Sequence, residues 1–330
     1  MREPADEILR QIREGTYRCT ADGPFGRAVE EAREQARWGD TDAAWRTLRA
    51  ALPEWLPLGP DHLAPVGLCA DLLISPLITP ERGRELLATP RAGQQGDAPP
   101  PAADLDPPGL AWLAEGDPGN FLVSYRFLLV EGVEPTELPG RIGADDSAVL
   151  DEPTTLWDSR TRVHQMWEDE ALTAVGRAGP GWSFAFEPQS GRGFNEGRFV
   201  SPGTAASRGT RAVTVWSEPS HGDRPGVVHL SVAERGEERY AFTVRGAAVS
   251  RRGTVPVALD PDGLFPQDEP HEERLGERRV LEALAAEFGD RLPRLALERG
   301  RLHTFRTRSW SRPPSPGEGF VMIDIGWQQP

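Results

Sequence analysis

The chain has 330 residues, of which 38% are hydrophobic and 27% charged, and its formal net charge is −14. The length favours about two domains, and the acidic balance argues against nucleic-acid binding, which needs a basic face. All 37 basic residues are arginines, which excludes P-loop, Schiff-base and kinase-type lysines and a Ser–Lys dyad.

The cysteines and the hydropathy of the chain indicate which metal, disulfide and membrane features to expect. Cys19 and Cys69 form neither a CxxC metal pair nor a disulfide framework. The first residues are charged, without an apolar targeting segment, and no stretch approaches the roughly 20 apolar residues of a membrane span. The sequence therefore predicts a cytoplasmic protein without membrane contact, metal or cofactor.

Residues 1–90 carry helical periodicity in the first half and Pro-punctuated apolar pieces from 54 onwards. We expect an amphipathic helix over 4–15, then a helical hairpin whose first helix ends at Gly39, and a further helix from Thr79 or Pro80 to Leu87. The hairpin resembles one tetratricopeptide unit, but no second copy follows, so an array is not predicted. These residues predict an all-α domain.

A Pro/Gly-rich stretch at 91–108 lacks any apolar period and predicts a linker. From residue 109 to 330 we expect an α+β domain. Its run 121–130 fits either a strand or a helix, because periodicity does not separate the two. Further helices are expected at 135–142 and about 270–288, and a final strand at 320–325.

The stretch 181–249 alternates apolar and polar residues in four runs. Period-2 patterning predicts an antiparallel meander with one face on a core and the other in water. The inward residues are Trp182, Phe184 and Phe186; Val213 and Val215; Val228, Leu230 and Val232; and Tyr240, Phe242 and Val244. The predicted fold class is α+β: an N-terminal helical domain, then a mainly antiparallel sheet with flanking helices.

Three residues are candidates for acid–base chemistry. Glu187 ends the first run of the meander, and no partner at a working separation is evident. His229 alternates with apolar neighbours, which predicts a half-exposed position on the outer side of its strand. His164 stands four residues before Glu168, which fits a surface pair better than a metal site because two ligands are too few.

The segment 301–312 mixes arginines with aromatic residues, and it is the candidate surface for a partner. Arginine pairs with carboxylates or phosphates, and aromatic rings stack on bases. Alternatively, these arginines neutralise the chain's own acidic tracts at 104–117, 131–146 and 151–170. If the segment binds a partner, a protein is favoured over nucleic acid. The candidate residues are Arg301, His303, Phe305, Arg306, Arg308 and Trp310.

Several short motifs resemble an uncharacterised actinobacterial family, a domain of unknown function with a Gly-Trp…Glu-Pro signature. They are the segments 181–188, 207–213 and 260–264 with the helix after them, and 127–132 followed by a Pro-initiated helix and 143–144. The likeness covers about residues 109–300; the insert near 189–206 and the tail after 300 depart from it. It implies a bacterial cytosolic setting and assigns no catalytic residue.

Two functions fit these observations. The first is a non-enzymatic interaction factor, possibly of an immunity or antitoxin-like kind, because an acidic chain complements a basic protein surface. The second is an enzyme of an unrecognised class, a hydrolase or a biosynthetic-cluster protein, with a site near the sheet. Convergence of two acid–base candidates in one cleft would favour the enzyme. The oligomeric state is left open.

Overall fold

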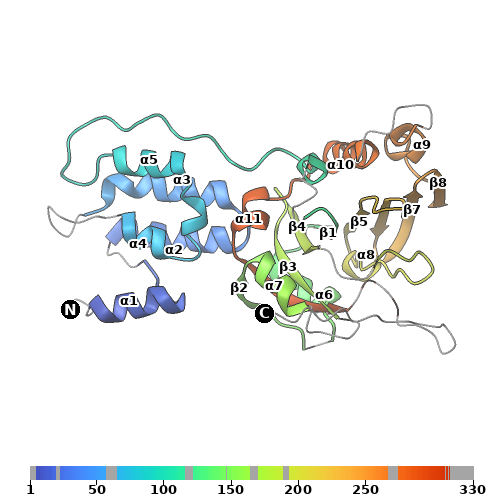
Figure 1. Ribbon diagram of the computed structural model, residues 1–330, viewed down its shortest axis with the longest axis horizontal. Helices are drawn as coiled ribbons and strands as arrows, with labels where there is room; N and C mark the ends of the chain where they lie inside the picture. Colours follow the sequence, from blue (N-terminus) through green and yellow to red (C-terminus); the bar gives the residue numbers. More distant parts are fainter. Residues whose placement is uncertain are drawn as a thin grey trace.

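The computed structural model describes residues 5–19, 23–56, 65–115, 122–145, 147–163, 170–188, 193–266, 274–308, 310 and 312. Within them, helices come first and a sheet with flanking helices follows (Figure 1). The α+β class is thereby confirmed. The predicted strand at 320–325 lies outside the described residues.

The N-terminal helices form a small unit around one apolar cluster. Gly39 adopts φ +89°, which allows α2 to stop and the chain to reverse into α3. The cluster includes Phe25, Trp45 and Leu48, but also Leu295 from the far end of the sequence. The helices are α1 (Ala5–Glu14), α2 (Gly23–Arg37), α3 (Thr41–Ala51), α4 (Pro65–Ala70) and α5 (Pro80–Ala88), with 3-10 turns at Leu52–Glu54 and Ser75–Leu77.

Between α5 and the 3-10 helix η3 (Ala111–Glu115) the chain forms no helix or strand. It crosses the outside of the helical unit towards the sheet (Figure 1). Leu105 of this stretch packs against the helical core cluster. The predicted linker is therefore bound to the helices along part of its length, and we call residues 97–108 the strap.

The described strands form one nine-stranded antiparallel sheet, in the order β2-β9-β3-β4-β1-β5-β6-β7-β8. Of the run 121–130, residues 125–130 are a strand. The strands are β1 (Tyr125–Glu131), β2 (Asp151–Thr154), β3 (Glu170–Arg177), β4 (Trp182–Pro188), β5 (Arg211–Glu218), β6 (Val227–Glu234), β7 (Glu237–Arg245), β8 (Ala248–Gly253) and β9 (Leu302–Arg308).

The meander prediction is right in its inward residues and wrong in two respects. All eleven alternating residues of 182–244 lie in one core cluster. However, β4 does not pair with β5, because β1 lies between them. The second face is also not in water: it carries its own buried cluster, including Ala185, Trp216 and Phe305.

Short helices and loops cover both faces of the sheet. On the first face, Trp112 of η3 and Leu281 and Leu284 of α10 join the core; on the second, Leu138, Ala206 and Phe194 do so. The remaining elements are the 3-10 turn Pro135–Glu137, α6 (Leu138–Ile142), α7 (Leu156–Val163), α8 (Gly203–Ala206), the 3-10 turn Val257–Leu259, α9 (Pro261–Leu264), α10 (Leu275–Phe288) and α11 (Arg294–Arg299).

Among the described residues, no helix combines the length and the apolar character that crossing a membrane requires.

Candidate functional site

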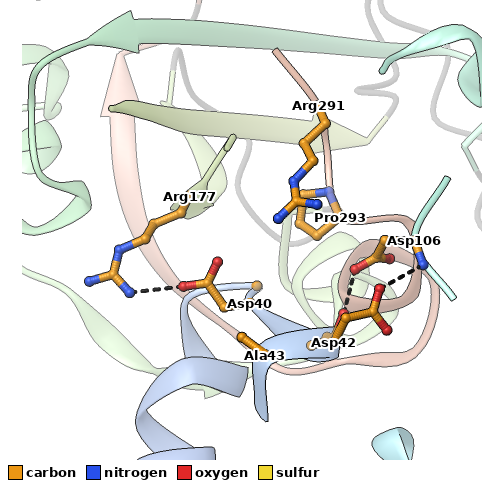
Figure 2. A pocket seen from close by; sticks show the side chains of 9 residues that line it. Asp40, Asp42, Ala43, Asp106, Arg177, Arg291 and Pro293 are labelled. Carbon is orange, nitrogen blue, oxygen red and sulfur yellow. Dashed lines mark hydrogen bonds and ion pairs between the residues drawn. The ribbon is translucent and has the colours of Figure 1, made fainter. Parts of the chain in front are cut away.

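A small pocket lies where the helical unit, the strap and the sheet meet (Figure 2). The turn from Gly39 to Ala43 forms one wall, Asp106 of the strap another, and Arg177, Arg291 and Pro293 close it from the side of the sheet. The free volume is about 20 Å³, which is room for a water molecule rather than for a substrate.

The carboxylates of this pocket already have partners. Asp40 stands at the N-cap position of α3 but makes no capping bond; instead it pairs with Arg177 at 2.9 Å. Asp106 accepts hydrogen bonds from the Thr41 hydroxyl at 2.5 Å and from the Leu295 N–H at 2.8 Å. Burial raises the pKa of Asp106, and these two bonds partly offset that rise. The pocket therefore joins the two parts of the molecule and presents no nucleophile beside a free base.

Glu187 is inside the protein and is paired. It is 1% exposed and accepts a bidentate pair of bonds from Arg126 on the neighbouring strand, one of them at 2.6 Å. Burial raises the pKa of Glu187, and the guanidinium counteracts that rise. The guanidinium carbon of Arg126 lies 4.6 Å from the ring centre of Trp216 and 5.2 Å from that of Trp310. The two rings and Glu187 thus enclose this cation.

His229 is also inside, which corrects the half-exposed position expected for it. It is 1% exposed, because Phe194 and Phe199 lie against its ring at centroid distances of 5.1 and 4.4 Å. Its Nδ1 is 2.9 Å from the Thr243 hydroxyl, while Nε2 has no hydrogen-bond partner among the described residues. Burial lowers the pKa of His229 to about 3, so the ring is neutral at pH 7.

Glu187 and His229 share one row across the sheet. Register places Glu187 beside Arg126, Arg126 beside Trp216, and Trp216 beside His229. The two candidates are thus on the same face but separated by two strands, and aromatic side chains fill the space between them. Together they form no open cleft. His164, the third candidate, lies outside the described residues.

The predicted partner surface at 301–312 is largely an interior strand. β9 lies between β2 and β3, and Phe305 and Trp310 are 0% and 1% exposed, so neither ring is available to a partner. His303 is half-buried; it stacks on Trp38 at 4.6 Å and its Nδ1 lies 2.8 Å from the Asp151 carbonyl. Arg306 is exposed, Arg301 is half-buried, and Arg308 ends the strand.

The sequence also allowed the arginines of 301–312 to neutralise the chain's own acidic tracts. In the structure, several residues of those tracts pair with arginines outside that segment. Asp104 pairs with Arg46 and Glu115 with Arg278, each at 2.8 Å, and Glu134 lies 3.7 Å from Arg177. Arginines of the helical unit, α10 and β3 thus reach these acidic residues.

Arg126 and Asp290 are among the buried charged residues that the sequence did not predict. Arg126 is a single charge within an apolar run, and such a charge signals a buried pair, so this residue could have been found. Asp290, after α10, is 2% exposed and neither carboxylate oxygen has a partner among the described residues. Burial, with a smaller contribution from Glu131, raises the pKa of Asp290 to about 8. No local pattern marked that position.

Within the described part of the chain, no three histidine, cysteine, aspartate or glutamate residues are placed to hold a metal ion. Comparison of the sequence with protein-family models and curated proteins, and of the fold with solved structures, finds no match. The resemblance to the actinobacterial family therefore stays a prediction.

Proposed function

We propose that this protein is a non-enzymatic interaction factor that binds a protein partner. The observation that supports it is that both described acid–base candidates are buried and engaged with neighbouring side chains. Glu187 is bound to Arg126, and His229 is a neutral ring beneath two phenylalanines. Both side chains pack inside the protein on the sheet. The surface of this acidic chain is therefore the part that we propose binds a partner.

An immunity or antitoxin-like role is the specific form that we propose. A net charge of −14 favours association with a basic surface through electrostatic steering, which weakens as salt screens it. A partner held in this way associates more slowly at high ionic strength.

The test is co-purification from the source cells, followed by size-exclusion chromatography and quantitative mass spectrometry. We expect one partner at a fixed stoichiometry, whose association rate falls between 50 and 500 mM salt, roughly as Debye screening requires. Recovery of the chain alone at every salt concentration would count against the proposal.

The enzyme alternative retains one observation in its favour: Glu187 and His229 share a row, and Nε2 of His229 lacks a partner in the described structure. Chemistry there requires the segment carrying Phe194 and Phe199 to lift. Alkylation of His229 by a histidine reagent in the folded protein, with exposed His221 as the internal reference, would show that opening. Protection of His229 throughout argues against an enzyme using this row.

A further inference from the structure

The helical unit holds the strap through the main chain of the strap. The N–H of Ala102 donates to Oε2 of Glu85 at 3.0 Å, and the N–H of Leu105 donates to the two oxygens of Asp42 at 3.0 and 3.2 Å. The N–H of Asp106 donates to Asp42 at 3.1 Å. Every residue except proline offers such a donor, so these bonds recognise the main chain, which bends at Asp106 and directs two successive N–H groups to one carboxylate.

The two accepting carboxylates are fixed from behind by the helices. Asp42 pairs with Arg82, which is fully buried and lies 5.4 Å from the centre of the Trp45 ring. Glu85 pairs with Arg49 and accepts the indole N–H of Trp45 at 3.3 Å. These contacts do not involve the strap, so the acceptors are preorganised for the main chain of a second segment.

Side chains of the strap add selectivity. Leu105 packs on the helical core cluster. Asp104 accepts two bonds of 2.8 Å from Arg46, and Asp106 is held by Thr41 and by the Leu295 N–H. The groove formed by α3 and α5 thus matches an Asp-Leu-Asp order, with an apolar side chain between two acids.

The strap covers this groove lightly. Asp97, Ala98, Pro101, Ala103 and Asp104 are exposed, and Leu105 is the strap's contribution to the apolar cluster. The flanking prolines at 99–101 and 107–108 favour an extended chain, which limits the entropy lost on docking. Covalent attachment supplies the strap at an effective concentration in the millimolar range, so a weak ligand suffices to occupy the groove.

We propose that the groove of α3 and α5 is a peptide-binding site that the strap occupies as an internal ligand. The partner that fits it is a protein with a proline-flanked Asp-Leu-Asp segment that bends at its second acid, as the strap does. Arg49 is paired with Glu85 and Arg82 with Asp42, so Arg46 is the groove cation that meets an acid of the strap. This inference rests on the proposed function as a protein-binding factor, and it identifies a surface and a partner class for it.

The test uses the full chain and a fluorescein-labelled peptide with the sequence of residues 97–110. In the double variant Asp104→Ser with Leu105→Ser, the tethered competitor is weakened. We expect this variant to bind the peptide at least about 10-fold more tightly than the wild type. Adding the exposed substitution Arg46→Ala to the double variant lowers its affinity for the peptide several-fold. A peptide in which the leucine at position 105 is replaced by serine serves as the matched control.

Hydrogen exchange of the wild type gives a second measurement that needs no folded variant. Excess peptide at about 1 mM, near the effective concentration of the tether, should accelerate exchange of the Leu105 and Asp106 amides by displacing the strap. The peptide-binding proposal is overturned if the folded double variant gains no affinity for the peptide. It is also overturned if saturating peptide leaves the exchange of the two amides unchanged. Peptide binding without any cellular partner supports the groove while the broader function fails, so the two failures are distinguishable.

Discussion

The helical unit and the sheet both bury arginine–carboxylate pairs, but they use the carboxylates differently. In the sheet, Glu187 gives both oxygens to Arg126, and aromatic rings close over the pair. In the helical unit, Asp42 holds Arg82 and also accepts the N–H groups of Leu105 and Asp106. The first pair is complete in itself, whereas the second keeps acceptors for the N–H groups of another segment. Burial of a charged pair therefore does not by itself distinguish a structural role from a binding role. The distinction lies in whether the carboxylate also accepts hydrogen bonds from a second segment.

The largest expected effect comes from breaking the pair in the sheet. Glu187→Leu leaves the Arg126 charge buried without a counterion, and we expect a loss of about 3–5 kcal/mol in the free energy of unfolding. Urea denaturation measures it. Adding Arg126→Met should restore most of the loss. Glu234→Leu, which removes a surface pair with Arg211, should cost under about 1 kcal/mol. Equal losses in the two single variants would contradict the buried pair.

In the helical unit, Asp42→Asn removes the charge opposite Arg82 but keeps one acceptor for the strap. We expect a loss of about 2–4 kcal/mol, somewhat smaller than for Glu187→Leu. The same variant should expose the Leu105 and Asp106 amides to faster hydrogen exchange. Asp97→Asn, at an exposed position of the strap, is the control for general effects on the strap. Unchanged exchange of both amides would show that Asp42 does not hold it.

His229 predicts a decline in stability on the acid side. Its folded pKa of about 3 lies below the unfolded value near 6.5, so the unfolded state binds the proton first. Its contribution is complete above pH 6.5 and falls by about 1.4 kcal/mol per pH unit from there towards pH 3. His229→Phe should flatten this slope relative to the wild type, and His221→Gln, at an exposed site, should not. Identical slopes in the wild type and His229→Phe would contradict the neutral buried ring.

Asp290 predicts an effect of the opposite sign. Its folded pKa of about 8 lies above the unfolded value near 3.9, so its contribution is complete below about pH 4 and is lost as the pH rises to 8. Relative to the wild type, Asp290→Asn should gain about 1.4 kcal/mol per pH unit as the pH rises from about 4 to 8, so its gain is larger at pH 9 than at pH 5. Thermal denaturation at both pH values measures the gain. Asp223→Asn, on an exposed turn, should show none.

The sequence predicted the core of the sheet better than its order. Alternation alone assigned residues such as Phe184, Val213 and Phe242 to one core, because a strand has a fixed period. It did not place β1 between β4 and β5, since pairing depends on contacts that local patterns do not contain. It also left the second face in water, because Ala185 and Ser183 look polar or small beside phenylalanines. The helix expected at 135–142 was not assigned to that face, and α8 is too short to be recognised.

The site was less predictable than the fold. Asp42 and Glu85 are ordinary helix residues by sequence, and only their joint approach to Ala102 and Leu105 identifies a groove. The arginines and aromatics of 301–312 were conspicuous, yet their alternation is that of an interior strand covered on both sides. Composition marks a surface only when the strand that carries it is known to be exposed.

The position of β1 has a consequence for synthesis. Its two sheet neighbours, β4 and β5, follow it by about 50 to 90 residues in the register. On the ribosome, this apolar strand emerges long before either neighbour, whereas α2 and α3 meet within one hairpin. Non-local pairing closes slowly, and unpaired apolar strands aggregate. We therefore expect the helices to be folded early, and nascent β1 to be the stretch that most needs a chaperone.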